Sequence, residues 1–188
     1  MTYLVIGLVL FFAIHSVSII NENWRDGMVD RIGLVPWKGL YTLVSLGGFV
    51  LICYGYGAAR LEPIVLYSPP VWTRHITMAL MLFVFPLFLA ANLPGRLKTV
   101  AKQPLLAATK FWALAHLLAN GTLADVLLFG SFLAWAVVDR ISMKHRTQRP
   151  IPGLASPYND VIAVVVGLAI YAVFVVWGHA ALFGVGLV

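Results

Sequence analysis

Charged residues are scarce in this sequence: Asp, Glu, Lys and Arg make up 11% of its 188 residues, against about 25% in an average soluble domain. Cysteine is almost missing as well, because the one residue of this type, Cys53, lies in an apolar stretch. That scarcity excludes an internal disulfide and a cysteine-based metal cluster. The N-terminal region lacks a positively charged segment with a small-residue cleavage site, so we predict that residues 2–20 form a retained helix and not a signal peptide.

Hydrophobic residues, by contrast, make up 61% of the chain, and the mean hydropathy is +0.92. They gather in runs close to the roughly 20 residues that a membrane-crossing helix needs. We therefore predict an all-α integral membrane protein, a bundle of about six transmembrane helices in a single domain over residues 1–188. The expected helices cover residues 2–20, 39–59, 71–93, 105–119, 122–138 and 160–183. Thr122 and Asp125 have the spacing of a capping box at the start of the fifth helix.

The net charge of +6 indicates membrane orientation and not nucleic-acid binding, because the cations lie in the loops between apolar runs. Ten of them fall in the first, third and fifth loops: Arg25, Arg31, Lys38, Arg96, Lys98, Lys102, Arg140, Lys144, Arg146 and Arg149. Only Arg60 and Arg74 fall on the other side. This asymmetry predicts a multi-pass membrane protein with both termini away from the cytoplasm. The lipid bilayer is the expected partner, and the sequence carries no signal for an oligomeric state.

Histidine is the most frequent ionisable residue inside the predicted helices. Such residues usually face the interior of a helix bundle and mark functional sites, although a single one often only hydrogen-bonds to a neighbouring helix. The intramembrane candidates are His15, His75, His116, His179 and Lys110. Only His145 among the histidines lies in a loop.

Several histidines with almost no intramembrane carboxylates favour haem over other chemistry. The serines lie in no nucleophile motif, and no His-Glu-x-x-His zinc signature is present. Haem needs one or two imidazoles, an apolar pocket and cations for its propionates. His116 lies in the apolar and aromatic segment 111–118, which suits a macrocycle. Lys110 is either a propionate partner or a lysine that reaches the membrane interface.

Several motifs resemble one family of bacterial membrane proteins. They are Leu93-Pro94-Gly95-Arg96, Lys102-Gln103-Pro104, segments 111–121 and 127–135, and the shorter segments 11–16, 41–46 and 73–75. Together they resemble the NnrU family, inner-membrane proteins often found with denitrification genes. The resemblance extends over essentially the whole chain.

The NnrU family is related to zeta-carotene isomerase of plants and cyanobacteria, a membrane protein that binds haem b. That enzyme uses bis-histidine ligation and redox-dependent ligand exchange to isomerise a cis double bond. The resemblance implies that His15 and His116 match two of its histidines. A third histidine of the isomerase belongs to an Arg-His-Pro motif. Here the motif reads Lys102-Gln103-Pro104. Related membrane methyltransferases use that motif in cofactor binding, so its loss counts against methyl transfer.

Depth in the membrane favours a different pair of iron ligands. At about 1.5 Å per residue, His15 and His116 differ in depth by roughly 10 Å. His75 and His179 lie closer in depth to His116, with Arg74 beside them as a candidate propionate partner. The metal ligands are therefore His116 with His15 by resemblance, and His116 with His75 or His179 by depth.

Three functions follow from these observations. The first is a haem b protein with a redox, isomerase or denitrification-linked role, acting on a hydrophobic small molecule or within a denitrification membrane complex. The second is a non-enzymatic assembly or partner protein for such a complex. The third is a membrane methyltransferase relative. The sequence leaves open whether the protein is an enzyme, and an enzyme of this kind would be a haem-dependent cis-trans isomerase.

Overall fold

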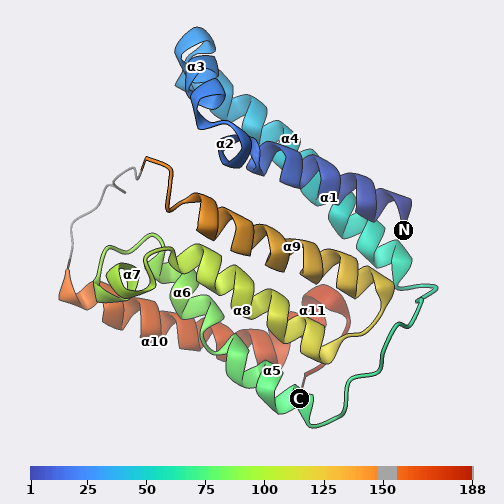
Figure 1. Ribbon diagram of the computed structural model, residues 1–188. Coiled ribbons are helices and arrows are strands. Elements are labelled where there is room, and N and C mark those ends of the chain that lie inside the picture. The colour runs from blue at the N-terminus through green and yellow to red at the C-terminus, as the bar shows by residue number, and fades with distance from the viewer. Residues whose placement is uncertain (148–155, 188) are drawn as a thin grey trace. The chain divides into compact units, whose positions relative to one another are not determined.

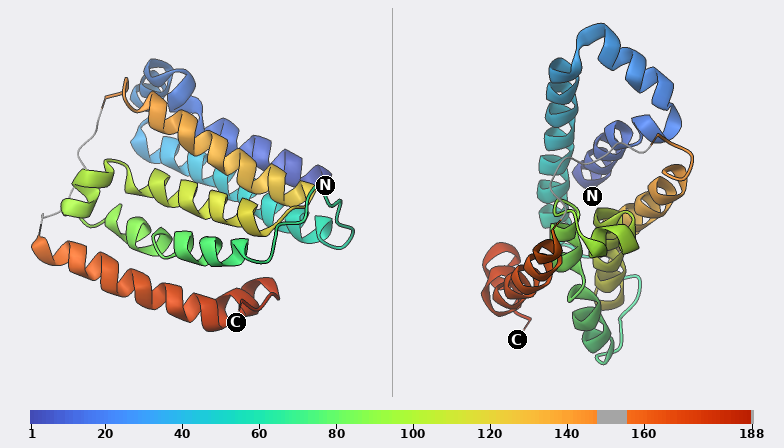
Figure 2. Two further views of the ribbon diagram at one scale, coloured as in Figure 1. Left: turned by 60° about the horizontal axis from the view of Figure 1, so that its bottom comes forward. Right: turned by 90° about the vertical axis from the view of Figure 1, so that its left-hand side faces the viewer.

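The chain is helical almost throughout in the computed structural model, which describes residues 1–147 and 156–187 (Figure 1, Figure 2). Three of its helical segments are long and apolar enough to cross a membrane: Leu34–Ala59, Thr73–Ala90 and Tyr158–Phe183. Two shorter apolar helices cover Thr2–His15 and Pro104–Ala119. The described residues form no strand. The predicted all-α integral membrane fold is confirmed.

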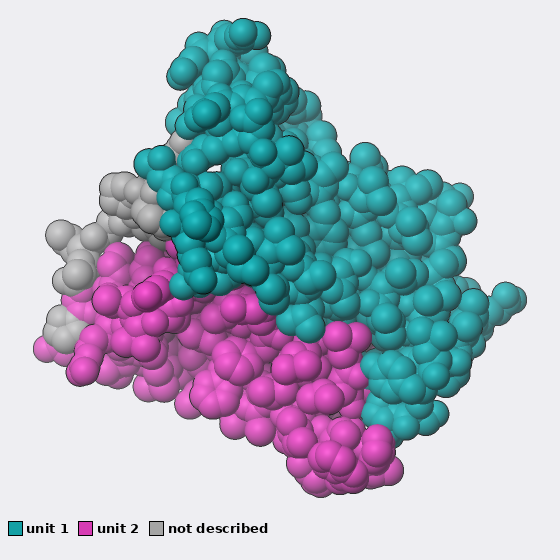
Figure 3. Space-filling view, viewed as in Figure 1, with its two compact units in different colours: residues 1–69, 120–148 teal, residues 70–119, 149–188 magenta. Residues whose placement is uncertain are grey.

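Contacts divide the chain into two compact units, Met1–Pro69 with Asn120–Gln148, and Pro70–Ala119 with Arg149–Val188 (Figure 3). The first unit contains α1 (Thr2–His15), α2 (Val17–Ile20), α3 (Glu22–Ile32), α4 (Leu34–Ala59) and α9 (Leu123–Ser142). The second contains α5 (Thr73–Met81), α6 (Val84–Ala90), α7 (Arg96–Ala101), α8 (Pro104–Ala119), α10 (Pro157–Val173), the π-helical η1 (Phe174–Gly178) and α11 (His179–Phe183). The predicted single domain over residues 1–188 stays a prediction.

Glycines bring α1 and α4 of the first unit together, and the two helices run side by side in Figure 1. A Cβ atom built on Gly48 would lie 2.8 Å from the backbone nitrogen of Phe11. A Cβ on Gly7 would lie 2.6 Å from the backbone nitrogen of Ile52. Small residues at such crossings let backbones approach closely, which strengthens van der Waals packing between helices in lipid.

A buried carboxylate ties the start of α9 to α4. Asp125 is only 4% exposed and accepts a hydrogen bond from the Tyr56 hydroxyl at 2.5 Å. Its second oxygen accepts from the backbone nitrogen and the hydroxyl of Thr122 at 2.9 and 2.6 Å. The Thr122 hydroxyl in turn accepts from the Asp125 backbone nitrogen, so the predicted capping box is present. The carboxylate thus serves both as a helix cap and as a link between two helices.

The loop after α4 docks on the turn that precedes α9. The backbone nitrogens of Leu66 and Tyr67 both donate to the carbonyl oxygen of Gly121, at 2.8 and 3.1 Å. The Tyr67 hydroxyl donates to the Asn120 carbonyl oxygen at 2.8 Å. Burial and the nearby Asp125 carboxylate both raise the pKa of the Tyr67 phenol, so this group stays protonated and able to donate. These bonds satisfy backbone groups that an apolar environment would otherwise leave unpaired.

In the second unit, α10 packs on α6, and α8 packs on α5 and α6. Gly167 of α10 lies against Pro86, where an added Cβ would come within 2.6 Å of the proline nitrogen. Pro86 also accounts for the break between α5 and α6, because it has no N–H to donate to the carbonyl of Leu82. The predicted helix over residues 71–93 is therefore two helices in one spanning segment.

Two segments predicted as loops are helical. Residues 22–32 form α3, because the Asn21 side chain accepts from the Trp24 backbone nitrogen at 2.9 Å and caps the helix start. Gly33, with φ of 89°, ends α3, and α4 begins at Leu34 because Pro36 is tolerated in a first helical turn. Residues 96–101 form α7. Arg149, counted among the ten cations, lies outside the described residues.

Candidate functional site

The predicted site residues are divided between the two units. His15 ends α1 in the first unit and is half-buried. The others belong to the second unit: Arg74 and His75 are exposed in the first turn of α5, Lys110 and His116 are half-buried in α8, and half-buried His179 begins α11.

His15 lines a polar chamber within the first unit. The chamber has a volume of about 300 Å³, and its walls come from α1 to α4, from α9 and from the segment that follows α9. The polar and aromatic side chains on its walls include His15, Arg25, Tyr41, Trp135, Asp139 and Arg146. A volume near 300 Å³ is at the lower end of the range for ligand pockets. The chamber is thus the place in this unit where an intramembrane histidine meets charged and hydrogen-bonding groups.

The ring of His15 is held in one orientation and one tautomer. Its Nδ1 lies 2.6 Å from the carbonyl oxygen of Phe11, one helical turn earlier. A carbonyl oxygen can only accept, so Nδ1 carries the hydrogen and Nε2 keeps its lone pair. Phe11 stacks on the imidazole at 4.0 Å between ring centroids, and the rings of Tyr41 and Trp135 lie 5.0 and 5.8 Å away. Metal-binding histidines commonly show this arrangement, with the other ring nitrogen donating to a carbonyl.

Ion pairs hold the charged walls of the chamber. Arg146 pairs with Asp139 near the end of α9. On α3, Arg25 pairs with Asp26 at 2.6 Å and its Nε donates to the Ser18 hydroxyl at 3.3 Å. Each cation on the chamber wall therefore has a carboxylate partner, which balances its charge in an apolar environment.

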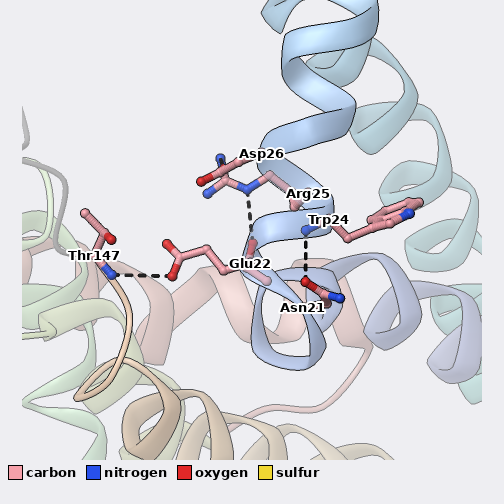
Figure 4. A network of polar contacts seen from close by, with 7 residues as sticks. Asn21, Glu22, Trp24, Arg25, Asp26 and Thr147 are labelled. Carbon is pink, nitrogen blue, oxygen red and sulfur yellow. Dashed lines mark hydrogen bonds and ion pairs between the residues drawn. The ribbon is translucent and has the colours of Figure 1, made fainter.

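Polar contacts anchor the start of helix α3, as Figure 4 shows. The Glu22 carboxylate accepts from the backbone nitrogen of Thr147 at 3.4 Å, which joins α3 to the segment after α9. Trp24 lies edge-on to Trp37 of α4, at 6.1 Å between ring centroids. These contacts position Arg25 at the chamber wall.

An aromatic donor on the chamber wall lacks an acceptor among the described residues. The indole Nε1 of Trp135 is buried and makes no hydrogen bond to the described part of the chain. Buried donors of this kind are nearly always satisfied by protein, water or ligand. The indole therefore marks a position where an oxygen atom of a bound molecule would be stabilised.

Replacing Arg146 with Ala is expected to destabilise the protein by on the order of 2 kcal/mol, because the Asp139 carboxylate, 9% exposed, loses its ion-pair partner. The double variant Asp139→Asn/Arg146→Ala is expected to recover part of that loss, since it leaves no buried charge. Thermal unfolding of the detergent-solubilised variants measures both. A double variant that is no more stable than Arg146→Ala would show that the two side chains are not coupled.

Two histidines of the second unit show the same tautomer as His15. Nδ1 of His116 lies 2.8 Å from the Trp112 carbonyl oxygen, and Nδ1 of His179 lies 2.7 Å from that of Val185. His179 directly follows the π-helical turn η1, an element frequent at functional sites. Among the described residues, no group of three or more His, Cys, Asp or Glu side chains is placed to hold a metal ion. The pairing of His116 with His15, His75 or His179 stays a prediction.

The comparison with protein families gives one match, to the family model described as NnrU protein, over residues 3–187. The chain belongs to the NnrU family. The resemblance seen in the sequence is thereby confirmed over nearly the whole chain of this membrane protein. Neither the comparison with curated proteins nor the comparison with solved structures found a match.

Sequence reasoning missed most of the chamber of this NnrU-family chain. Arg25 and Arg146 entered the sequence analysis only as topology charges, and Asp139 was not among the predicted site residues. A usable signal was present, because Asp139 and Arg146 are seven residues apart at the end of an apolar helix, where an acid and a base can pair. Tyr41 and Trp135 gave no such signal, since aromatic residues are common at membrane interfaces.

The chamber contains the kinds of side chain that would hold a haem. His15 supplies one imidazole with Nε2 as the nitrogen able to ligate, and Arg25 and Arg146 supply cations. The other histidine of the first unit, His145, is exposed beyond the end of α9. The described residues of this unit therefore offer a single imidazole to a ligand in the chamber.

Proposed function

We propose that this NnrU-family membrane protein binds haem b in the chamber, with His15 Nε2 as an iron ligand, and has a redox role. The observation that carries the proposal is the hydrogen bond from His15 Nδ1 to the Phe11 carbonyl. It fixes the ring and makes Nε2 the ligating atom, as outer-shell partners do in metal sites. The relation of the NnrU family to a haem b isomerase gives independent support.

The chamber residues have separable roles in this proposal. The Phe11 carbonyl raises the basicity of the His15 ligand. Arg25 and Arg146 line the chamber and would pair with the propionates. Both guanidinium groups already bind a carboxylate of the protein itself, that of Asp26 or of Asp139. The Trp135 indole would donate to an oxygen of the bound group. A haem held in this way supplies one-electron redox chemistry, whose potential depends on its axial ligands and on burial.

A redox role takes precedence over carotene isomerisation because of the chamber walls. An apolar polyene needs a long apolar channel, whereas Arg25, Asp139 and Arg146 line this chamber. Burying an apolar chain against charged groups would cost the hydration of those groups without new hydrogen bonds. The side chains of the chamber match, in chemical type, a ligand with both an aromatic ring and charged substituents, such as haem.

Purified wild-type protein reconstituted with haem b is expected to show a Soret band, and His15→Ala is expected to weaken haem binding more than about 100-fold. The factor follows because even loss of an outer-shell partner costs about 10- to 100-fold in metal affinity. His145→Ala, which removes an exposed histidine of the same unit, is the matched control and should behave as wild type. Absorption titrations of oxidised and reduced protein measure these affinities.

Two further measurements sharpen this test. Added imidazole should restore the Soret band of His15→Ala, because it can occupy the position of the missing ligand. His116→Ala should be measured in parallel, since a change from a low-spin to a high-spin spectrum would identify it as a second ligand. A wild-type protein that takes up no haem would contradict the proposal. It would favour the alternative, a non-enzymatic assembly partner of a denitrification membrane complex.

A further inference from the structure

The second unit carries an apolar groove between α7 and the start of α10. Its volume is about 510 Å³, and its walls include Leu97 and Val100 of α7 with Val161, Val164 and Val165 of α10. Val100 is 78% exposed, and Val161 and Val165 are 59% and 60% exposed. Exposed valines that line one groove indicate a binding site for an apolar ligand.

Hydrogen bonds to α10 fix the floor of this groove. The Asp160 carboxylate accepts from the backbone nitrogens of Arg96 and Leu97, at 2.8 and 2.9 Å. The Asn159 side-chain nitrogen donates to the Pro94 carbonyl oxygen at 2.7 Å. Gly95 permits this approach, because an added Cβ would lie 2.9 Å from the Asp160 carboxyl carbon. The groove is therefore a fixed feature of the second unit.

The mouth of the groove is positively charged. The carboxylate of Asp160 is engaged by two backbone donors, whereas the Arg96 guanidinium is exposed and has no ion pair or hydrogen bond within the described residues. Lys102 is exposed at the end of α7. Lys98 is the exception, since its Nζ donates to the Ala91 carbonyl oxygen at 2.8 Å. Arg96 is thus the cation on the groove wall that is placed to bind an outside anion.

The groove also lies at the depth of lipid phosphates. The spanning segment Thr73–Ala90 ends six residues before Arg96, and the segment Tyr158–Phe183 begins two residues before Asp160. Since Asp160 and Arg96 are in contact, both segments end at the same membrane face. The valines of α10 continue from there toward the hydrocarbon, so the positive mouth lies at the headgroup level.

We propose that this groove binds an anionic phospholipid, with one acyl chain along Val161, Val164 and Val165 and the phosphate on Arg96. The apolar walls fit the chain, and a guanidinium can bind phosphate oxygens through two parallel hydrogen bonds. An apolar helix of another protein would leave the Arg96 charge without an anion. Charge complementarity therefore favours a lipid over a protein helix as the occupant.

Native mass spectrometry of the full-length protein in detergent tests the proposal, with dioleoylphosphatidylglycerol and dioleoylphosphatidylcholine as probes. Wild type is expected to bind phosphatidylglycerol about ten-fold more tightly than phosphatidylcholine, and Arg96→Gln is expected to remove this preference. Arg31→Gln, which removes an exposed arginine of the first unit, is the matched control and should keep it.

A second variant tests the groove itself. Val165→Trp fills the groove from an exposed position and is expected to weaken binding of both lipids by about ten-fold while thermal stability is unchanged. An Arg96→Gln variant that keeps the phosphatidylglycerol preference would overturn the phosphate contact. A Val165→Trp variant that binds both lipids as wild type would overturn the acyl-chain position. Equal binding of the two lipids by wild type would overturn the proposal as a whole.

Discussion

Gly48→Leu is expected to destabilise the protein strongly, whereas Gly47→Leu, one residue away on the same helix, should leave its stability nearly unchanged. A Cβ on Gly48 would lie 2.8 Å from the Phe11 backbone nitrogen and 3.1 Å from the Gly7 carbonyl oxygen. Backbone atoms cannot rotate away as a flexible side chain can, so α1 and α4 would have to separate. A Cβ on Gly47 would have no atom of the described residues within 4 Å apart from its chain neighbours and the backbone of its own helical turns.

The expected loss for Gly48→Leu exceeds about 3 kcal/mol, the upper end of ordinary overpacking, because the whole α1–α4 interface is displaced. Small domains have only about 5–15 kcal/mol of stability to lose. Size-exclusion chromatography after heating of the solubilised variants gives the two melting temperatures. Gly55→Leu and Gly57→Leu repeat the contrast about two helical turns further along α4, since a Cβ on Gly55 would meet the Leu4 backbone and one on Gly57 would meet no described atom outside its own helical turns. Equal stability within each pair would show that α1 does not pack on this face of α4.

Asp125→Ala is expected to cost about 3 kcal/mol or more. The change leaves the Tyr56 hydroxyl and both the hydroxyl and the backbone nitrogen of Thr122 without their acceptor in a buried place. An unsatisfied buried donor costs about 1–3 kcal/mol. Asp125→Asn should be less damaging, because one amide oxygen can still accept from Tyr56.

Two smaller changes calibrate this result. Tyr56→Phe removes one of the three hydrogen bonds and should cost about 1 kcal/mol. Asp30→Ala, which removes an exposed carboxylate from α3, should be near neutral, because surface substitutions usually change stability by less than about 0.5 kcal/mol. Chemical unfolding in mixed micelles ranks the four variants. If Asp125→Ala were no worse than Tyr56→Phe, the capping hydrogen bonds to Thr122 would contribute nothing.

The membrane fold could be predicted because long apolar runs have few alternatives in lipid, where every backbone group must be bonded within a helix. The short polar helices α3 and α7 could not be found by apolar length. For α3, the cap residues Asn21 and Gly33 lie at the spacing expected for the two ends of a short helix, and this signal could have predicted it. For α7 the decisive group is Asp160, which lies more than sixty residues later in the chain. No local pattern reports such a partner.

Only part of the candidate site could be predicted, because a local sequence pattern does not reveal contacts with distant segments. His15 could be singled out, because an imidazole in an apolar helix is unusual. Its surroundings could not, since Tyr41, Trp135 and Asp139 reach it from distant segments. The glycines of α4 give a parallel case. A row of small residues indicates close packing, but only the structure separates Gly48, which touches α1, from Gly47, which does not.

The docking of the loop after α4 on the turn before α9 has a consequence for biogenesis. Leu66 and Tyr67 receive their hydrogen-bond acceptor, the Gly121 carbonyl, only after more than fifty further residues have been made. At a synthesis rate of about 5–20 residues per second, this delay lasts roughly 3–10 s. During that interval α5 to α8 enter the membrane while the first unit is incomplete. The nascent chain therefore carries α1 and α4 as an early helical hairpin, and α9 closes the unit last.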